Sequence, residues 1–168
     1  MGGPESPSVF SGVPCSITQA ETPAHIAQAR ELFLEYAHSL SFSLCFQNFE
    51  QELAELPGGY APPSGRLLLA SVEGLPAGCV ALHKLGENVC EMKRLYLRPQ
   101  FRGKGMGLEL ARAAIAEARA MGYESMRLDT VEPVMQDAVA IYRGLGFREI
   151  PPYCENPVAG AVYMELML

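Results

Sequence analysis

The stretch VCEMKRLYLRPQFRGKGMGL, residues 89–108, holds the most informative pattern in this chain of 168 residues. Residues 89–97 are mostly apolar and end before a proline, as is typical of a β-strand. Three glycines follow within a few residues, and a helix is predicted to begin among them and to continue to Met121. They are Gly103, Gly105 and Gly107. The N–H groups at a helix start lack helical partners, and glycine lets an anion approach the backbone, so the stretch predicts a phosphate-binding turn.

The glycine turn alone does not identify its ligand. Arg102 and Lys104 add positive charge there, but glycines and cations also suit plain chain reversal and solubility. A Walker A loop is excluded, because it needs Ser or Thr directly after its lysine and Lys104 is followed by Gly105. The spacing disfavours the dinucleotide fingerprint G-x-G-x-x-G. Asp129, at the end of the next strand, still stands roughly where that fold binds a ribose, so this alternative stays open.

Strands and helices are predicted on both sides of this stretch. Thr22-Pro23 begins a helix to about Leu40. Further helices are predicted over 45–56 and 135–145, and strands over 16–18, 66–72, 78–85, 125–130, 147–150 and 161–167. Residues 66–97 then form an antiparallel meander, and the strand–helix–strand unit over 89–130 must be a right-handed parallel crossover. We therefore predict an α/β fold with a mixed, mostly antiparallel twisted sheet of about six or seven strands and about four helices.

The composition fits a folded soluble protein, with 49% apolar and 19% charged residues. Residues 1–14 are rich in Gly, Pro and Ser without a basic start or an apolar run, so we expect a flexible tail before a single domain over 15–168. No apolar run is long enough to cross a bilayer, so we expect no membrane partner. The net charge of −6 argues against general nucleic-acid binding and mildly favours a cationic substrate.

The five cysteines are scattered and odd in number, and none forms a C-x-x-C pair. With only three histidines in the chain, no zinc pattern can be drawn, and we expect no metal. Reduced thiols in a cytoplasmic protein are the simplest account.

Two segments together resemble the GNAT N-acetyltransferase family. Gln100-Phe101-Arg102-Gly103-Lys104-Gly105 is similar to its central motif, written Q/R-x-x-G-x-G/A after a strand. AVAIYRGLGF, residues 138–147, is similar to its A-x-x-x-Y-x-x-x-G-F helix end. Both occur in the expected order, separated by a helix and a strand. The resemblance covers residues 66–168 well and the N-terminal third only in element order, and it implies the acyl-CoA N-acyltransferase (GNAT) fold.

The resemblance implies that acetyl-CoA binds along residues 89–108 as a co-substrate. The backbone of Leu95, Tyr96 and Leu97 would pair with the pantetheine arm like an added strand, in a slot opened by a bulge. The side chains of Leu95 and Leu97 would point into the core. The glycine turn would hold the pyrophosphate, with Arg102 and Lys104 as electrostatic support. Its residues would be Gly103, Lys104, Gly105, Met106, Gly107 and Leu108.

The resemblance also implies the chemistry. Tyr142 would be the general acid, because a phenol of pKa about 10 can donate a hydrogen bond to a departing thiolate of pKa about 8.5. Glu91 is the candidate base, with His83 or a water chain as alternatives; the other interpretation of Glu91 is an exposed or salt-bridged strand carboxylate. We expect direct attack without an acyl-enzyme, since the cysteines show no arrangement with a base that would suit a covalent relay. A backbone N–H near Leu97 would bond the oxyanion.

The acceptor is the least determined part. By the resemblance, the first two helices and the loop before the last strand surround it, and the candidates are Tyr36, Ser39, Phe42, Tyr153 and Asn156. Many relatives carry asparagine seven residues before the tyrosine, where this chain has Met135, so that cofactor contact is in doubt.

The predicted function is transfer of an acetyl group from acetyl-CoA to a primary amine of a small molecule or amino-acid-like substrate. Acetylation of a protein or peptide amine, and a non-catalytic acyl-CoA-binding regulatory domain, remain as alternatives. A homodimer is expected only from the family resemblance.

Overall fold

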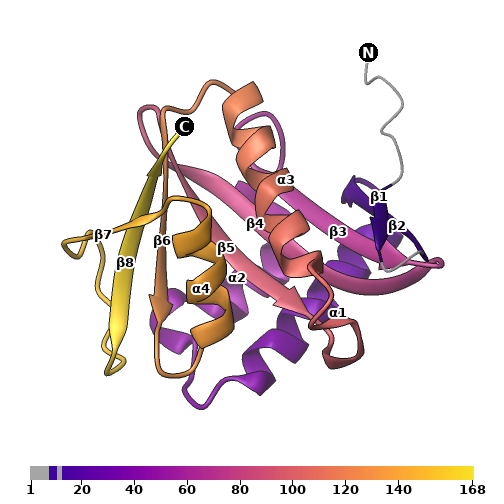
Figure 1. Cartoon of the computed structure of the whole chain (residues 1–168), viewed down its shortest axis with the longest axis horizontal. Coiled ribbons are helices and arrows are strands. Elements are labelled where there is room, and N and C mark those ends of the chain that lie inside the picture. The colour runs from indigo at the N-terminus through magenta and orange to yellow at the C-terminus, as the bar shows by residue number, and fades with distance from the viewer. Residues whose placement is uncertain (1–7, 11–12) are drawn as a thin grey trace.

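The computed structural model describes residues 8–10 and 13–168, and its framework is an eight-stranded sheet with helices on both faces (Figure 1). The strands are β1 (Ser8–Phe10), β2 (Val13–Gln19), β3 (Arg66–Val72), β4 (Leu75–Gly86), β5 (Val89–Leu97), β6 (Ser125–Val131), β7 (Arg148–Ile150) and β8 (Ala161–Met167). The helices are α1 (Pro23–Ser39), α2 (Phe49–Glu55), α3 (Met106–Ala120) and α4 (Gln136–Gly144). Among the described residues, none of the helices is long and apolar enough to cross a bilayer.

The sheet order is β1-β2-β3-β4-β5-β6-β8-β7. β3, β4 and β5 pair antiparallel, and β5 pairs parallel with β6 across α3. The predicted fold class, with its meander and crossover, is therefore confirmed. The sheet has one strand more than expected, because β1 pairs with β2 inside the segment interpreted as a tail. Residues 1–7 and 11–12 of that segment lie outside the described residues.

The first two helices differ in how closely they follow the sequence pattern. Thr22 caps α1 as predicted, since its Oγ1 accepts a hydrogen bond from the backbone N–H of His25 at 3.1 Å. The continuous helix predicted over 45–56 is wrong at its centre. A 3₁₀ turn at Cys45–Gln47 ends at Asn48, which adopts the left-handed conformation (φ 55°), and α2 starts after it. Asparagine tolerates this conformation better than most residues, and a helix cannot pass through it.

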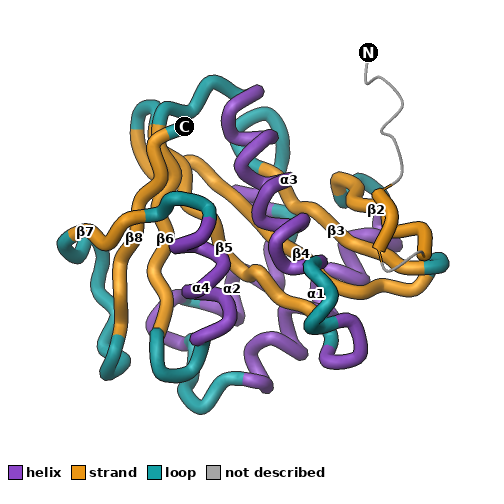
Figure 2. Tube along the Cα trace, in the orientation of Figure 1, coloured by secondary structure: helices purple, strands orange, loops and turns teal. Residues whose placement is uncertain are grey.

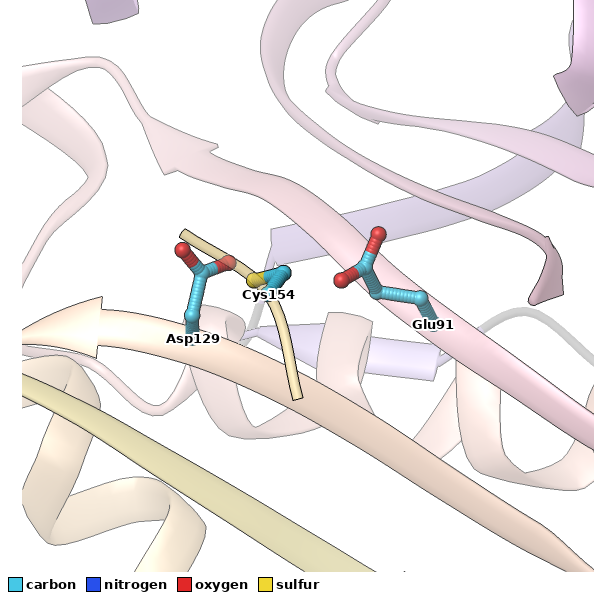
Figure 3. Close-up of side chains that lie close together, drawn as sticks. All are labelled: Glu91, Asp129 and Cys154. Atoms are coloured by element: carbon cyan, nitrogen blue, oxygen red, sulfur yellow. The ribbon is translucent and has the colours of Figure 1, made fainter. Parts of the chain in front are cut away.

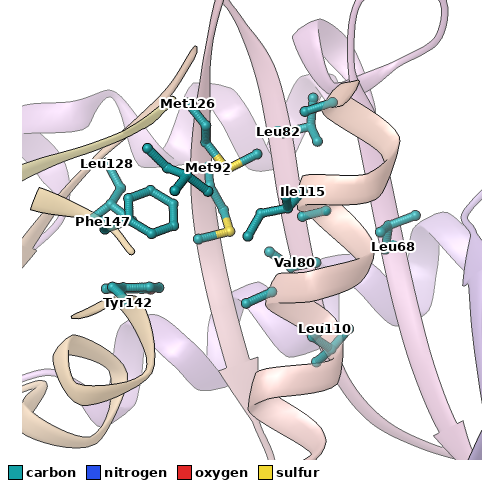
Figure 4. Close-up of a cluster of buried hydrophobic side chains, with 14 of the residues drawn as sticks. Leu68, Val80, Leu82, Met92, Leu110, Ile115, Met126, Leu128, Tyr142 and Phe147 are labelled. Carbon is teal, nitrogen blue, oxygen red and sulfur yellow. The ribbon is translucent and has the colours of Figure 1, made fainter. Parts of the chain in front are cut away.

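Each face of the sheet has its own apolar core. α3 and α4 cover one face, where Leu110, Ile115 and Tyr142 pack on side chains of β3 to β6 (Figure 4). α1 and α2 cover the other face, where Phe33 and Phe49 pack on the sheet. The two helix pairs therefore fix the two sides from which the middle of the sheet can be reached.

The middle of the sheet separates where β5 leaves β6. These strands pair only over Val89–Glu91, and the rest of β5 diverges (Figure 2). A β-bulge lies just beyond that point. Cys79 opposes Tyr96 while Ala81 opposes Lys93, so two residues of β5 face one of β4. Arg94, in the bulge, has a left-handed φ of 61°, and the bulge bends β5 away from its neighbour.

Candidate active site

The separation of β5 from β6 opens a cleft of about 810 Å³, within the size range of small-molecule sites. Its walls are the end of β5, the turn before α3, the end of β6 and the start of α4. The walls include most of the residues predicted to bind cofactor, namely Leu95, Tyr96, Leu97, Arg102, Gly103, Gly105, Met106, Gly107 and Leu108. Lys104 belongs to the same turn but is not among the lining residues. The fold thus gathers most of residues 92–108 around one cavity.

The glycine turn has the backbone that its sequence predicts. Gly103 and Gly105 have φ values of 80° and 88°, which side chains with a Cβ rarely adopt. The first helical hydrogen bond of α3 runs from Glu109 N–H to the carbonyl of Gly105 at 3.1 Å. The N–H groups of residues 106–108 therefore have no partner within the helix and are free to hold an anion.

Arg102 joins the turn to the end of β5. Its Nε donates to the carbonyl oxygen of Leu97 at 2.9 Å, and its guanidinium lies 5.6 Å from the centre of the Tyr96 ring. The side chains of Leu95 and Leu97 pack against the α3/α4 core. The predicted side-chain direction of these two leucines is confirmed. Beyond Glu91, β6 is not paired with β5, so this part of β5 presents its backbone to the cleft.

Tyr142 lies on α4 and lines the cleft, with 7% of its surface exposed. Burial, together with the charges of Tyr36 and Asp129, raises the pKa of the phenol well above 10, so the group stays protonated. Among the described residues, none makes a hydrogen bond to its hydroxyl. Every fully buried polar side-chain atom of the described residues has a partner, so this oxygen cannot be fully buried. The hydroxyl therefore opens to the cleft as an available donor.

Glu91 is 5% exposed, and both of its carboxylate oxygens are occupied. Oε1 lies 2.8 Å from Nε2 of His83 and 3.8 Å from Nζ of Lys93, and Oε2 accepts a hydrogen bond from the Tyr153 hydroxyl at 2.7 Å. Burial alone would raise the pKa of Glu91, but these donors outweigh it and the pKa is lowered. Glu91 is thus an ionised, salt-bridged strand carboxylate here, and its role as a base stays a prediction.

A smaller pocket of about 30 Å³, here called the acceptor pocket, lies on the α1/α2 side of the strand separation. It shares part of its lining with the cleft: Tyr36, Met92, Lys93, Arg94, Asp129, Thr130 and Met135. Of the predicted acceptor residues, Tyr36, Phe42 and Asn156 line this pocket, and Ser39 lines the cleft. Tyr153 lines neither and instead holds Glu91.

The loop over residues 151–160 crosses the point where β5 and β6 part. Its Tyr153 bonds Glu91 of β5, and Nδ2 of Asn156 donates to Oδ2 of Asp129 of β6 at 3.0 Å. Figure 3 shows that Cys154 of this loop sits between the two carboxylates, and one ligand-type atom of each lies within 4.8 Å of the others. This grouping of two carboxylates and a thiol comes from three separate segments, which is why sequence spacing did not reveal it.

Arg94 is a site residue that the sequence pattern did not single out. It is 4% exposed, and its Nε and Nη2 donate to the two carboxylate oxygens of Glu52 at 2.9 and 3.0 Å. Its Nη1 donates to Gln47 at 2.8 Å, and its guanidinium lies 5.1 Å from the centre of the Phe49 ring. Arg94 therefore anchors the segment around α2 to the bulge of β5. The one signal in the sequence that could have indicated Arg94 is its charge within a mostly apolar strand, residues 89–97.

Comparisons with known proteins agree with this geometry. Residues 26–147 match the model of the Acetyltransferase (GNAT) family. An uncharacterised N-acetyltransferase of Schizosaccharomyces pombe is 40% identical over 153 residues, which cover 90% of this chain and 93% of that protein.

Solved structures share the fold. An acetyltransferase from Streptococcus agalactiae matches 92% of this chain and 98% of its own with a TM-score of 0.73 at 21% identity. A Salmonella typhimurium structure solved with its cofactor acetyl-CoA matches 91% of this chain and 93% of its own, with a TM-score of 0.64 at 17% identity. At these identities the two solved structures show the fold alone. Membership of the family is shown by the family model and by the Schizosaccharomyces pombe relative. The chain belongs to the acetyltransferase (GNAT) family.

Proposed function

We propose that this protein transfers the acetyl group of acetyl-CoA to a primary amine of a small molecule or amino-acid-like substrate, by direct attack and with Tyr142 as general acid. One observation carries the proposal. The cleft opened between β5 and β6 is lined both by the glycine turn and by Tyr142. An anion-binding helix start and a protonated phenol thus face one cavity, as a phosphate-bearing thioester substrate requires.

The cleft residues fit acetyl-CoA, which would supply the acetyl group as a thioester. The N–H groups at the start of α3 would hold the pyrophosphate, and the edge of β5 at residues 95–97 that is not paired with β6 would pair with the pantetheine arm. Arg102 is tied to Leu97 and Tyr96, so its charge is fixed beside the turn. Met135 stands where many relatives have asparagine, and its sulfur accepts a hydrogen bond from Thr130 Oγ1 at 3.2 Å in place of an amide contact.

In the reaction, the amine nitrogen attacks the thioester carbonyl carbon, a C–N bond forms and the C–S bond breaks. Tyr142 donates a hydrogen bond to the departing sulfur, which leaves as a thiolate and takes its proton from solvent after release. Its raised pKa favours donation of a hydrogen bond over full ionisation. A backbone N–H near Leu97 would stabilise the oxyanion.

A bound ammonium must lose one proton before its nitrogen can attack and a second as the C–N bond forms, and each proton released needs a route to solvent. Glu91 is proposed as its acceptor, reached through water from the acceptor pocket. Its partner His83 lines a separate surface recess of about 290 Å³ on the α2 side. Glu91 itself lines neither cavity, but its partner Lys93 lines both the acceptor pocket and this recess, and the proposed route would run from Glu91 through His83 to the open surface.

The acceptor pocket has room for little more than the amine end of a substrate, and we propose a small amine as that substrate. The test is release of CoA thiol from acetyl-CoA with a panel of primary amines and short peptides. We expect transfer to at least one small amine. Binding of acetyl-CoA without transfer to any amine or peptide would instead favour the non-catalytic acyl-CoA-binding alternative.

A further inference from the structure

We infer that Asp129 binds the ammonium group of the acceptor at the junction of the acceptor pocket and the cleft, so that the acceptor is a cationic alkyl amine. The inference rests on the proposed function and assigns a residue and a substrate class that the family pattern does not supply.

The position of Asp129 is set by the end of β5–β6 pairing. The last paired residues are Glu91 and Arg127, and Asp129 is the next residue of β6 on the same face as Arg127. It lines both the acceptor pocket and the cleft. A group held by Asp129 therefore lies in the gap through which an acceptor on the α1/α2 side reaches a thioester in the cleft.

The charge pairing around Asp129 is incomplete. In the part of the chain that the structure describes, the acidic side chains that are not fully exposed are Glu35, Glu52, Glu91, Glu109, Glu117, Asp129, Glu132 and Glu165. Each of them except Asp129 has a Lys, Arg or His partner within 4.0 Å. A half-buried carboxylate without a cation is costly, and an acceptor ammonium would supply the missing charge.

The cations nearest to this region are already committed. Arg127 pairs with Glu165 at 2.7 Å, and Arg94 pairs with Glu52. Lys93 pairs with Glu91, although only at 3.8 Å. Among the described residues, none of these ion pairs includes Asp129. An ammonium that enters the pocket therefore competes with no Lys, Arg or His of these pairs for the Asp129 carboxylate.

The oxygens of Asp129 and Glu91 differ in availability. Glu91 has both oxygens engaged, whereas Asp129 accepts one hydrogen bond, from Asn156 to Oδ2. Asn156 thereby fixes the carboxylate plane and leaves Oδ1 without a donor among the described residues. Burial raises the pKa of both Tyr36 and Tyr142, and the negative charge of Asp129 adds to this rise, which places Asp129 within electrostatic reach of the two rings that flank the junction.

The test compares the wild-type protein with Asp129→Asn, which keeps the shape of the side chain and can still bond Asn156. With an amine that the wild type acetylates, we expect KM for the amine to rise about 10- to 100-fold, as for loss of a hydrogen bond to a charged group. KM for acetyl-CoA should change less than about twofold. Asp129→Glu should recover part of the loss.

Two further variants separate binding from support of the loop. Glu155→Gln removes an exposed charge of the same loop and should leave both KM values unchanged. Asn156→Ala removes the hydrogen bond from Asn156 to Asp129 but keeps the Asp129 carboxylate. It should therefore raise KM for the amine less than Asp129→Asn does. Equal increases of KM for the amine in Asn156→Ala and Asp129→Asn would mean that Asp129 only holds the loop, which overturns the inference.

A binding measurement keeps the inference independent of catalysis. Calorimetry of alkylamines with the protein saturated with CoA should show binding that Asp129→Asn weakens and that benzyl alcohol, a neutral analogue of benzylamine, does not reproduce. Unchanged amine binding in Asp129→Asn, or no binding of any alkylamine to the wild type, contradicts the inference. Amine binding without any acetyl transfer would contradict the proposed function alone.

Discussion

The two sides of the strand separation are built from different kinds of groups. On the α3/α4 side, the cleft is built largely from backbone, namely a glycine turn, a helix start and an unpaired strand edge. On the α1/α2 side, charged side chains are linked in pairs, among them Glu52–Arg94, Glu35–Arg98 and Glu91–His83. The first side is the proposed binding site of acetyl-CoA, and the second is the proposed binding site of the acceptor amine.

This contrast has a physical reason. Backbone groups bind an anion whatever the neighbouring side chains are, so the proposed cofactor side should tolerate changes of side chain such as Met135. Side-chain charges act only when their partners are in place, because a buried charge without its partner is strongly destabilising. The acceptor side should therefore be the more fragile one, and four predictions test this difference.

The largest effect is expected at Arg94. Replacing this buried guanidinium in Arg94→Met leaves the Glu52 carboxylate without its cation and should lower the free energy of unfolding by about 3–5 kcal/mol. Urea denaturation measures it. The control is Arg112→Met, which breaks an exposed pair with Glu109 and should cost less than about 1 kcal/mol. Similar losses in the two variants would show that the acceptor side does not depend on its buried pair.

The next effect is expected at Gly105. Gly105→Val puts a β-branched residue at a φ of 88° directly before α3, and this should weaken acetyl-CoA binding about 100-fold, or about 3 kcal/mol. Gly122→Val is a matched control, because Gly122 has a φ of 87° just after the other end of the same helix and does not line the cleft. Calorimetry should show weaker binding only for the first; equal affinities would remove the turn from the site.

Tyr142→Phe should lower kcat about 30-fold while KM for acetyl-CoA stays within about threefold, since only the hydrogen bond to the departing sulfur is lost. Thiol release under saturating substrates measures this. Tyr123→Phe is the control; that hydroxyl bonds the carbonyl of Ser64, away from the cleft. Undiminished turnover in Tyr142→Phe would take the tyrosine out of the mechanism.

The smallest effect is expected at Glu91 and depends on pH. The folded protein lowers the pKa of Glu91, so its ionised form stabilises the fold above the ordinary carboxyl pKa of about 4.3, and this contribution is lost as pH falls through the folded value. Glu91→Gln should therefore cost about 1 kcal/mol at pH 7 and progressively less in acid.

Unfolding free energies at several pH values measure this dependence. Glu87→Gln, an exposed carboxylate of the β4–β5 turn, should show no such pH dependence. A constant difference between wild type and Glu91→Gln at all pH values would show that the hydrogen bonds, and not the charge, carry the effect.

The strand, turn and helix of the α3/α4 side could be predicted almost completely from the sequence, because these parts are local. The glycine turn, the strand before it and the helix after it lie within about thirty residues, and periodicity together with glycine spacing describes them. The parallel crossover followed from chain geometry alone.

The acceptor side could not be predicted in the same way, because its partners lie far apart in the chain. Glu52 and Arg94 belong to different elements, and Asn156 meets Asp129 only through the loop before β8. Asp129 stood out in the sequence only as a position in a dinucleotide fold. Asn48 broke the expected helix because a single left-handed residue outweighs a helical apolar pattern.

Amide hydrogen exchange with and without acetyl-CoA tests the division between the two sides most directly. We predict that acetyl-CoA slows exchange in residues 92–97 and 103–108, where its pantetheine arm and pyrophosphate would take up free backbone N–H groups. Residues 45–56, on the acceptor side, should exchange as before. Unchanged exchange over 103–108, or protection confined to 45–56, would contradict the proposed site.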